Sequence, residues 1–97
     1  MATFVSLMNW TDQGIKDFRD TTKRADAFTG LVQQHGGSVR TIYWTLGEYD
    51  LVAVTEAPDD ETATAVALLL GSLGNVRTVT LRAFAAEEMA RIVAKTS

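Results

Sequence analysis

Two short segments carry apolar residues at both odd and even positions, and they limit the possible folds more than any other feature. From Phe4 to Met8 only Ser6 interrupts the apolar run, and the centre of residues 49–56 reads Leu-Val-Ala-Val. Successive side chains of a strand point to opposite sides of a sheet, so a strand of this kind is covered on both faces. The pattern predicts two central strands, at residues 3–10 and 49–56.

Two other segments, residues 38–46 and 76–84, alternate along the chain, which is the pattern of a strand with two different faces. Threonine and arginine recur in both, as is common at the edges of a sheet. The predicted faces are Val39, Thr41, Tyr43 and Thr45 against Arg40, Ile42, Trp44 and Leu46, and Arg77, Val79, Leu81 and Ala83 against Thr78, Thr80, Arg82 and Phe84.

Three segments have the three-and-four spacing of amphipathic helices. The first follows the capping sequence at residues 11–14, breaks near residues 20–22 and ends at Gly36. The second begins at Asp59 or Asp60 after Pro58 and ends near Gly74, and the third covers residues 85–95. The predicted order is therefore strand, helix, strand, strand, helix, strand and a last helix.

This order predicts an α+β, ferredoxin-like βαββαβ fold with an extra C-terminal helix, formed as one domain over residues 1–97. In that fold the first and third strands lie at the centre of an antiparallel sheet and the second and fourth at its edges, as the apolar patterns require. Two helices cover only one face, so we expect a second copy of the chain to cover the other. The expected partner is therefore the chain itself, as a homodimer or a higher homo-oligomer.

Composition excludes several classes of function. The chain has no cysteine, which favours the cytoplasm, and it has neither a run of apolar residues long enough for a bilayer nor a signal sequence. A net charge of -3 with mixed signs argues against nucleic-acid binding. With a single histidine, His35, we expect no metal site and no cofactor.

The candidate ligand-binding residues are polar side chains near strand ends, namely Tyr43, Tyr49, Asp50 and Arg82. If Gly47 and Glu48 form a two-residue turn, Asp50 shares one face with Tyr43, and a carboxylate beside a phenol can bind a ligand or move a proton. Arg82 can grip an anion. The structural alternative is that Asp50 ties down its hairpin and that Arg82 is an edge or interface arginine.

The segment Tyr43-Trp44-Thr45-Leu46-Gly47-Glu48-Tyr49-Asp50 resembles the GYD domain family, which is named after a glycine, tyrosine and aspartate in this hairpin. The likeness extends to residues 11–14, 56–60, 74–78 and 81–84. The resemblance implies a dimeric α+β barrel, in which two ferredoxin-like sheets face each other around a cavity. It implies no catalytic residues.

Three functions fit these residues. The leading hypothesis is a homo-oligomeric domain that binds a small organic ligand in the cavity between the sheets. A second is an enzyme of the cofactor-free monooxygenase or isomerase kind, with Asp50 as general base and a tyrosine or arginine near the developing charge. A third is a structural assembly or interaction module that binds no ligand.

Overall fold

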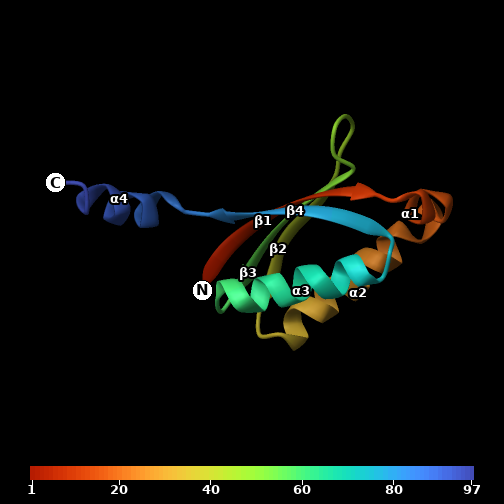
Figure 1. The fold of residues 1–97 in the computed structure, drawn as a ribbon, viewed down its shortest axis with the longest axis horizontal. Coiled ribbons are helices and arrows are strands. Elements are labelled where there is room, and N and C mark those ends of the chain that lie inside the picture. The colour runs from red at the N-terminus through yellow and green to blue at the C-terminus, as the bar shows by residue number, and fades with distance from the viewer.

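The computed structural model describes residues 1–97 and has the predicted order of helices and strands (Figure 1). The first predicted helix is divided, as expected, by a short 3-10 helix. The elements are β1 (Ala2–Trp10), α1 (Asp12–Lys16), η1 (Phe18–Asp20), α2 (Thr21–Gln34), β2 (Ser38–Trp44), β3 (Leu51–Ala57), α3 (Asp60–Ser72), β4 (Val76–Ala83) and α4 (Ala86–Ala94).

The four strands form one antiparallel sheet in the order β2-β3-β1-β4. β1 and β3 lie at the centre and β2 and β4 at the edges, which confirms the placement predicted from their apolar patterns. This is the ferredoxin-like strand order, so the predicted α+β class is confirmed. One chain holds an open sheet and closes no barrel by itself, so the two-chain barrel stays a prediction.

α2 and α3 lie on the same side of the sheet, and the core is the layer between them and the central strands (Figure 1). On β3 the side chains that face the helices are buried at every second position, beginning at Leu51. The buried core consists of Met8, Leu51 and Ala53 from the sheet and Phe28, Val32 and Val66 from the helices. We call this side of the sheet the helix-covered face.

Side-chain caps define the starts of two helices. Thr11 accepts a hydrogen bond from the Gly14 N–H at 3.0 Å, and Asp59 accepts one from the Thr62 N–H at 2.7 Å. The pKa of Asp59 lies below the ordinary value because its carboxylate accepts hydrogen bonds from Thr62. The bond from the Thr62 side chain has the larger effect and the bond from the Thr62 backbone the smaller. α3, which covers the core, therefore begins at a charged cap.

β2 differs from the predicted alternation because it contains a register shift, the sign of a β-bulge, between Val39 and Thr41. Val39 pairs with Thr55 and Ile42 with Ala53, so both face the helices instead of opposite sides. A bulge inserts one extra residue into a strand and reverses the parity of everything beyond it. Neither residue type nor spacing reveals such an insertion.

The hairpin keeps the predicted register but has a longer loop. Tyr43 pairs with Val52, and the Thr45 N–H donates to the Asp50 carbonyl at 2.9 Å. The strands themselves end at Trp44 and begin again at Leu51, and the loop between them projects from the body (Figure 1).

The C-terminal segment extends away from the rest of the fold. Figure 1 shows α4 at the far end of β4, beyond the edge of the helix layer, and the molecule is 52 Å long. The radius of gyration is 14.5 Å, whereas a compact domain of this length has about 12.5 Å. We call residues 84–97 the C-terminal arm. No helix of the chain has the length and apolar character that crossing a bilayer requires.

Candidate functional site

The sheet face opposite the helices carries a continuous apolar patch, which we call the open face. Strand register places its side chains next to one another across three strands. Val79 and Leu81 on β4 are 50% and 46% exposed. The patch consists of Val5 and Leu7 on β1, Val52 and Val54 on β3, and Val79 and Leu81 on β4. A contiguous patch of this kind on a small chain is typical of an interaction surface.

The accessible surface of the single chain is large for its mass. It measures 6436 Å², whereas folded monomers of this mass expose about 5,500 Å². The excess is roughly 900 Å², close to the area of about 800 Å² that each partner buries in a standard protein interface. The open face and the C-terminal arm both contribute exposed apolar side chains, namely Val79, Leu81, Phe84, Met89 and Val93.

Polar groups border the open face. Arg40 on β2 pairs with Glu56 on β3, and Arg77 lies beside Asn9 at the other end of the sheet. Tyr43 pairs with Val52 and is exposed, so its ring and hydroxyl stand at the β2 edge of the open face. An apolar centre with a polar rim is the usual composition of a protein interface.

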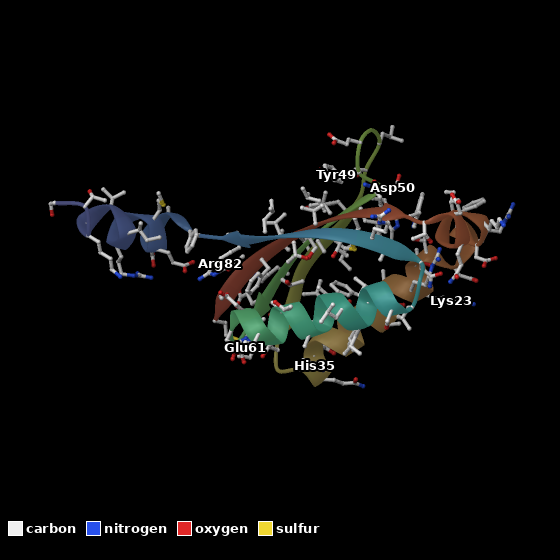
Figure 2. The ribbon with its side chains drawn as sticks, in the orientation of Figure 1. Lys23, His35, Tyr49, Asp50, Glu61 and Arg82 are labelled. Atoms are coloured by element: carbon white, nitrogen blue, oxygen red, sulfur yellow. The ribbon has the colours of Figure 1, made fainter.

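Asp50 connects the hairpin to the end of β1. Its carboxylate Oδ2 accepts a hydrogen bond from the Trp10 N–H at 2.9 Å, and its own N–H donates to the Met8 carbonyl at 2.9 Å. Tyr49 precedes it in the loop (Figure 2). The Tyr49 carbonyl accepts a hydrogen bond from the Thr45 hydroxyl. Asp50 therefore has a structural role between β1 and β3, whatever else it does.

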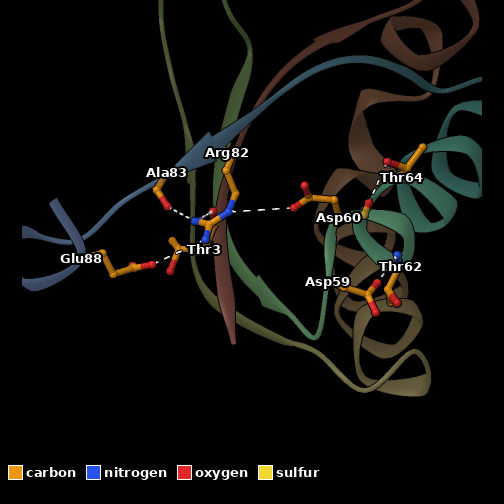
Figure 3. Close-up of polar contacts among 8 residues, drawn as sticks. All are labelled: Thr3, Asp59, Asp60, Thr62, Thr64, Arg82, Ala83 and Glu88. Atoms are coloured by element: carbon orange, nitrogen blue, oxygen red, sulfur yellow. Dashed lines mark hydrogen bonds and ion pairs between the residues drawn. The ribbon is translucent and has the colours of Figure 1, made fainter. Parts of the chain in front are cut away.

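Arg82 lies on the helix-covered face near the start of the C-terminal arm (Figure 3). Its guanidinium donates to the carbonyls of Thr3 and Ala83 and is 3.5 Å from the carboxylate of Glu88 and 3.9 Å from that of Asp60. The pKa of the Glu88 carboxyl is lowered mainly by the hydrogen bond that it accepts from the Ala85 N–H, and further by the hydrogen bond and charge of Arg82. Arg82 thus joins β1, α3 and the arm.

The single chain does not bring the four predicted residues into one site. Tyr43 is on the open face of one edge strand, whereas Arg82 is on the helix-covered face of the opposite edge strand. Figure 2 shows Tyr49 and Asp50 together at the hairpin and Arg82 far from them. Their roles in ligand binding stay predictions, and any site that contains Tyr43 lies on the open face.

The helix-covered side contains a cavity of about 440 Å³ that sequence analysis did not predict. Most of its lining is apolar, from α2, α3 and the strands. The charged exception is Arg24 on α2, whose Nη2 donates to the carbonyls of Gly14 and Asp17 at 3.1 and 3.0 Å, while its Nη1 is buried without an acceptor. Apolar residues that line it include Met8, Trp10, Phe28, Leu31 and Leu70.

A signal for Arg24 was present in the sequence. Arg24 precedes Phe28 by four residues and Leu31 by seven, so a cation stands on the apolar stripe of its helix. Such a position places the aliphatic part of the Arg24 side chain between α2 and the sheet instead of in water. The spacing of residues along the chain does not predict that space remains between α2 and the sheet at this position.

The comparison with protein families agrees with this fold and with the hairpin. The model of the GYD domain matches residues 4–93. The chain belongs to the GYD domain family. This confirms the resemblance seen at Gly47, Tyr49 and Asp50.

Two relatives of this GYD domain chain come from Thermus thermophilus. One is named "Glutamine synthetase and cystathionine beta-lyase binding protein" and is 37% identical over 84 residues, which cover 86% of this chain and 88% of that protein. The other is a crystal structure with 30% identity and a TM-score of 0.58, covering 89% of this chain and 96% of that one. The first name describes a protein that binds two enzymes.

Proposed function

We propose that this GYD domain protein is a homodimeric interaction module: two copies pair through their open faces, and the pair binds metabolic enzymes. The observation that carries the proposal is the uncovered apolar patch on β1, β3 and β4. Aliphatic side chains of this kind gain about 25 cal/mol for each Å² removed from water, and a second sheet of the same shape buries them all at once.

The C-terminal arm supports the pairing of two copies. Its apolar side chains, Phe84, Met89 and Val93, are about half exposed, and Figure 1 shows α4 beyond the rest of its own chain. An amphipathic helix of nine residues is marginal in water without a packing partner. In the proposed dimer the arm lies on the other copy.

The relative that binds glutamine synthetase and cystathionine β-lyase supports the second half of the proposal. With 37% identity over most of both chains, the two proteins share their fold and, in this proposal, their kind of partner. Glutamine synthetase and cystathionine β-lyase of the host cell are therefore the first partners to test. A cytoplasmic location, predicted from composition, suits such partners.

The proposed dimer also has a space between its two sheets, in which we predict that a small organic ligand binds. Tyr43 is the sequence-predicted residue that borders the open face, so it stands at the rim of that space. The cofactor-free enzyme alternative, with Asp50 as general base, also needs a ligand in that space.

Sedimentation velocity at micromolar concentration tests the pairing. We expect a dimer for the wild type and single chains for Val52→Lys, because an unpaired ammonium buried at the centre of the open face weakens the dimer by about a hundredfold or more. The matched control is Leu68→Lys, on the outer side of α3, where the leucine is 70% exposed. It should remain a dimer.

Binding of purified glutamine synthetase and cystathionine β-lyase to immobilised chain tests the partner. We expect saturable binding by the wild type and by Leu68→Lys, and weaker binding by Val52→Lys. Single chains at every concentration for the wild type contradict the dimer. Failure of both enzymes to bind a wild-type dimer contradicts the proposed partners alone.

A further inference from the structure

The loop between β2 and β3 rises on the same side of the sheet as the open face. Figure 1 shows it beyond β1 and β4, on the side opposite α2 and α3. The loop consists of residues 45–50, and Leu46, Gly47 and Glu48 at its tip are exposed. A second copy that covers the open face therefore stands beside this loop.

The tip of the loop carries an apolar side chain that its own chain does not use. Leu46 is 102% exposed, more than any other large apolar residue. Turn positions usually hold glycine, proline, asparagine, aspartate or serine, each of which favours the geometry of a turn. Here Gly47, with a φ of 111°, supplies that geometry. Leu46 contributes neither to the turn nor to the core of its own chain.

Hydrogen bonds hold the base of the loop in one position. The Thr45 N–H donates to the Asp50 carbonyl at 2.9 Å, and the carboxylate of Asp50 accepts from the end of β1 at 2.9 Å. On the other strand, the indole N–H of Trp44 donates to the Thr21 hydroxyl at 2.9 Å, which joins β2 to α2. An element that is ordered before it binds loses less conformational entropy on binding.

The reach of the loop matches the distance to a second sheet. Gly47 lies three residues beyond Trp44, and an extended chain covers about 3.3 Å per residue, so the tip reaches up to about 10 Å past the strand ends. Two sheets that pack face to face lie about 10 Å apart. Tyr43, which pairs with Val52 and is 65% exposed, continues the open face toward the loop.

We propose that the loop is a second contact between the paired copies, in which Leu46 of each copy packs against the other copy beside the joined open faces. This inference rests on the proposed dimer. A two-fold symmetric pair makes each contact twice, so two loops stabilise one dimer. The other occupant to consider is a bound enzyme. The position of the loop favours the second copy, because the loop stands where the second sheet lies.

Leu46→Ser tests the contact, with the dimer dissociation constant measured by sedimentation velocity over a range of concentrations. We expect the constant to rise about tenfold or more, because each dimer then buries two leucines fewer. The matched control is Leu68→Ser, which removes a leucine that is 70% exposed on the outer side of α3. It should leave the constant unchanged. Both leucines are exposed in the single chain, so neither variant should affect its folding.

Cross-linking locates the contact on the other copy. The chain has no cysteine, so Leu46→Cys and Leu68→Cys each give one attachment point for a photoreactive benzophenone maleimide. On illumination, the label at position 46 should join two copies covalently, whereas the label at position 68 should not. Mass spectrometry of the joined peptides should place the label from position 46 on the sheet or the C-terminal arm of the other copy.

The outcomes separate the loop contact from the dimer on which it rests. Single chains of the wild type contradict the dimer itself. A wild-type dimer whose dissociation constant is unchanged by Leu46→Ser, or which gives no joined copies from position 46, overturns the loop contact alone. An unchanged dissociation constant together with weaker binding of glutamine synthetase and cystathionine β-lyase by Leu46→Ser also overturns it, and assigns the loop to the enzymes instead.

Discussion

The two faces of β3 both carry apolar side chains at its centre, and they differ in what covers them. On β3, Leu51 and Ala53 face the helices and are buried, with Ala53 completely inaccessible, whereas Val52 and Val54 between them belong to the open face. On β4, Val79 and Leu81 of the open face are about half exposed. Thr80 and Arg82 on the helix-covered face of this edge strand are exposed as well, so the contrast is clearest on β3. Burial within one chain is therefore set by where the helices pack.

This contrast shows that one chain leaves an apolar sheet face uncovered. A strand that is apolar on both parities needs a cover on both sides, and the chain itself supplies two helices for one side only. The predictions that follow test whether the two faces really differ in this way, beginning with the largest expected effect.

Leu51→Ala should cost about 2–5 kcal/mol of the free energy of unfolding, because a buried leucine leaves a cavity in the core. The loss should be the same at every protein concentration. Its partner variant on the open face is Leu81→Ala. At concentrations low enough for single chains, that variant should stay within about 0.5 kcal/mol of the wild type.

Urea denaturation across a range of protein concentrations measures both variants. Under the proposed pairing, the loss caused by Leu81→Ala grows as dimers form, because stability is then linked to association. Equal losses for the two variants at low concentration would show that the faces do not differ.

Asp50→Ala should cost about 1–3 kcal/mol, because the Trp10 N–H loses its acceptor at the junction of β1 and β3. Asp50→Asn retains a side-chain oxygen and should lose less. Thermal denaturation of both variants gives the comparison. A fully stable Asp50→Ala would remove the structural role and strengthen the enzyme alternative, in which Asp50 is a base.

The smallest effect concerns the helix that covers the core. The folded-state pKa of Asp59 is below its ordinary value of 3.8, so its hydrogen bonds to Thr62 stabilise the folded chain above that value. This contribution is lost as the pH falls through the folded-state pKa. Asp59→Asn removes the titration and should flatten the change in urea midpoint between neutral pH and about pH 3. An unchanged pH profile would contradict the assignment.

Much of the fold was predictable because it depends on local pattern. The central strands followed from apolar residues on both parities, and the break in the first helix followed from the sequence near Asp20. The hairpin register, which pairs Tyr43 with Val52, followed from the turn at Gly47. The prediction that Val39 and Ile42 lie on opposite faces of β2 was wrong, because a β-bulge changes the register without a distinctive residue type.

The site was less predictable than the fold, because it depends on distances between elements. Parity correctly placed Arg82 with Thr78 and Thr80, but only strand order shows that this face is the one the helices cover. The same step separates Arg82 from Tyr43. The surroundings of Arg24 depend on how α2 packs against the sheet and against the segment that contains Gly14 and Asp17.

The amino-acid sequence by itself determined the order of the elements, the central and edge strands and the membership in the GYD domain family, because periodicity and turn residues act over a few neighbouring positions. Only the tertiary structure decided which face stays open, where the C-terminal arm extends and what surrounds Arg24. Those properties arise when distant segments pack, and packing depends on the shape of the whole chain.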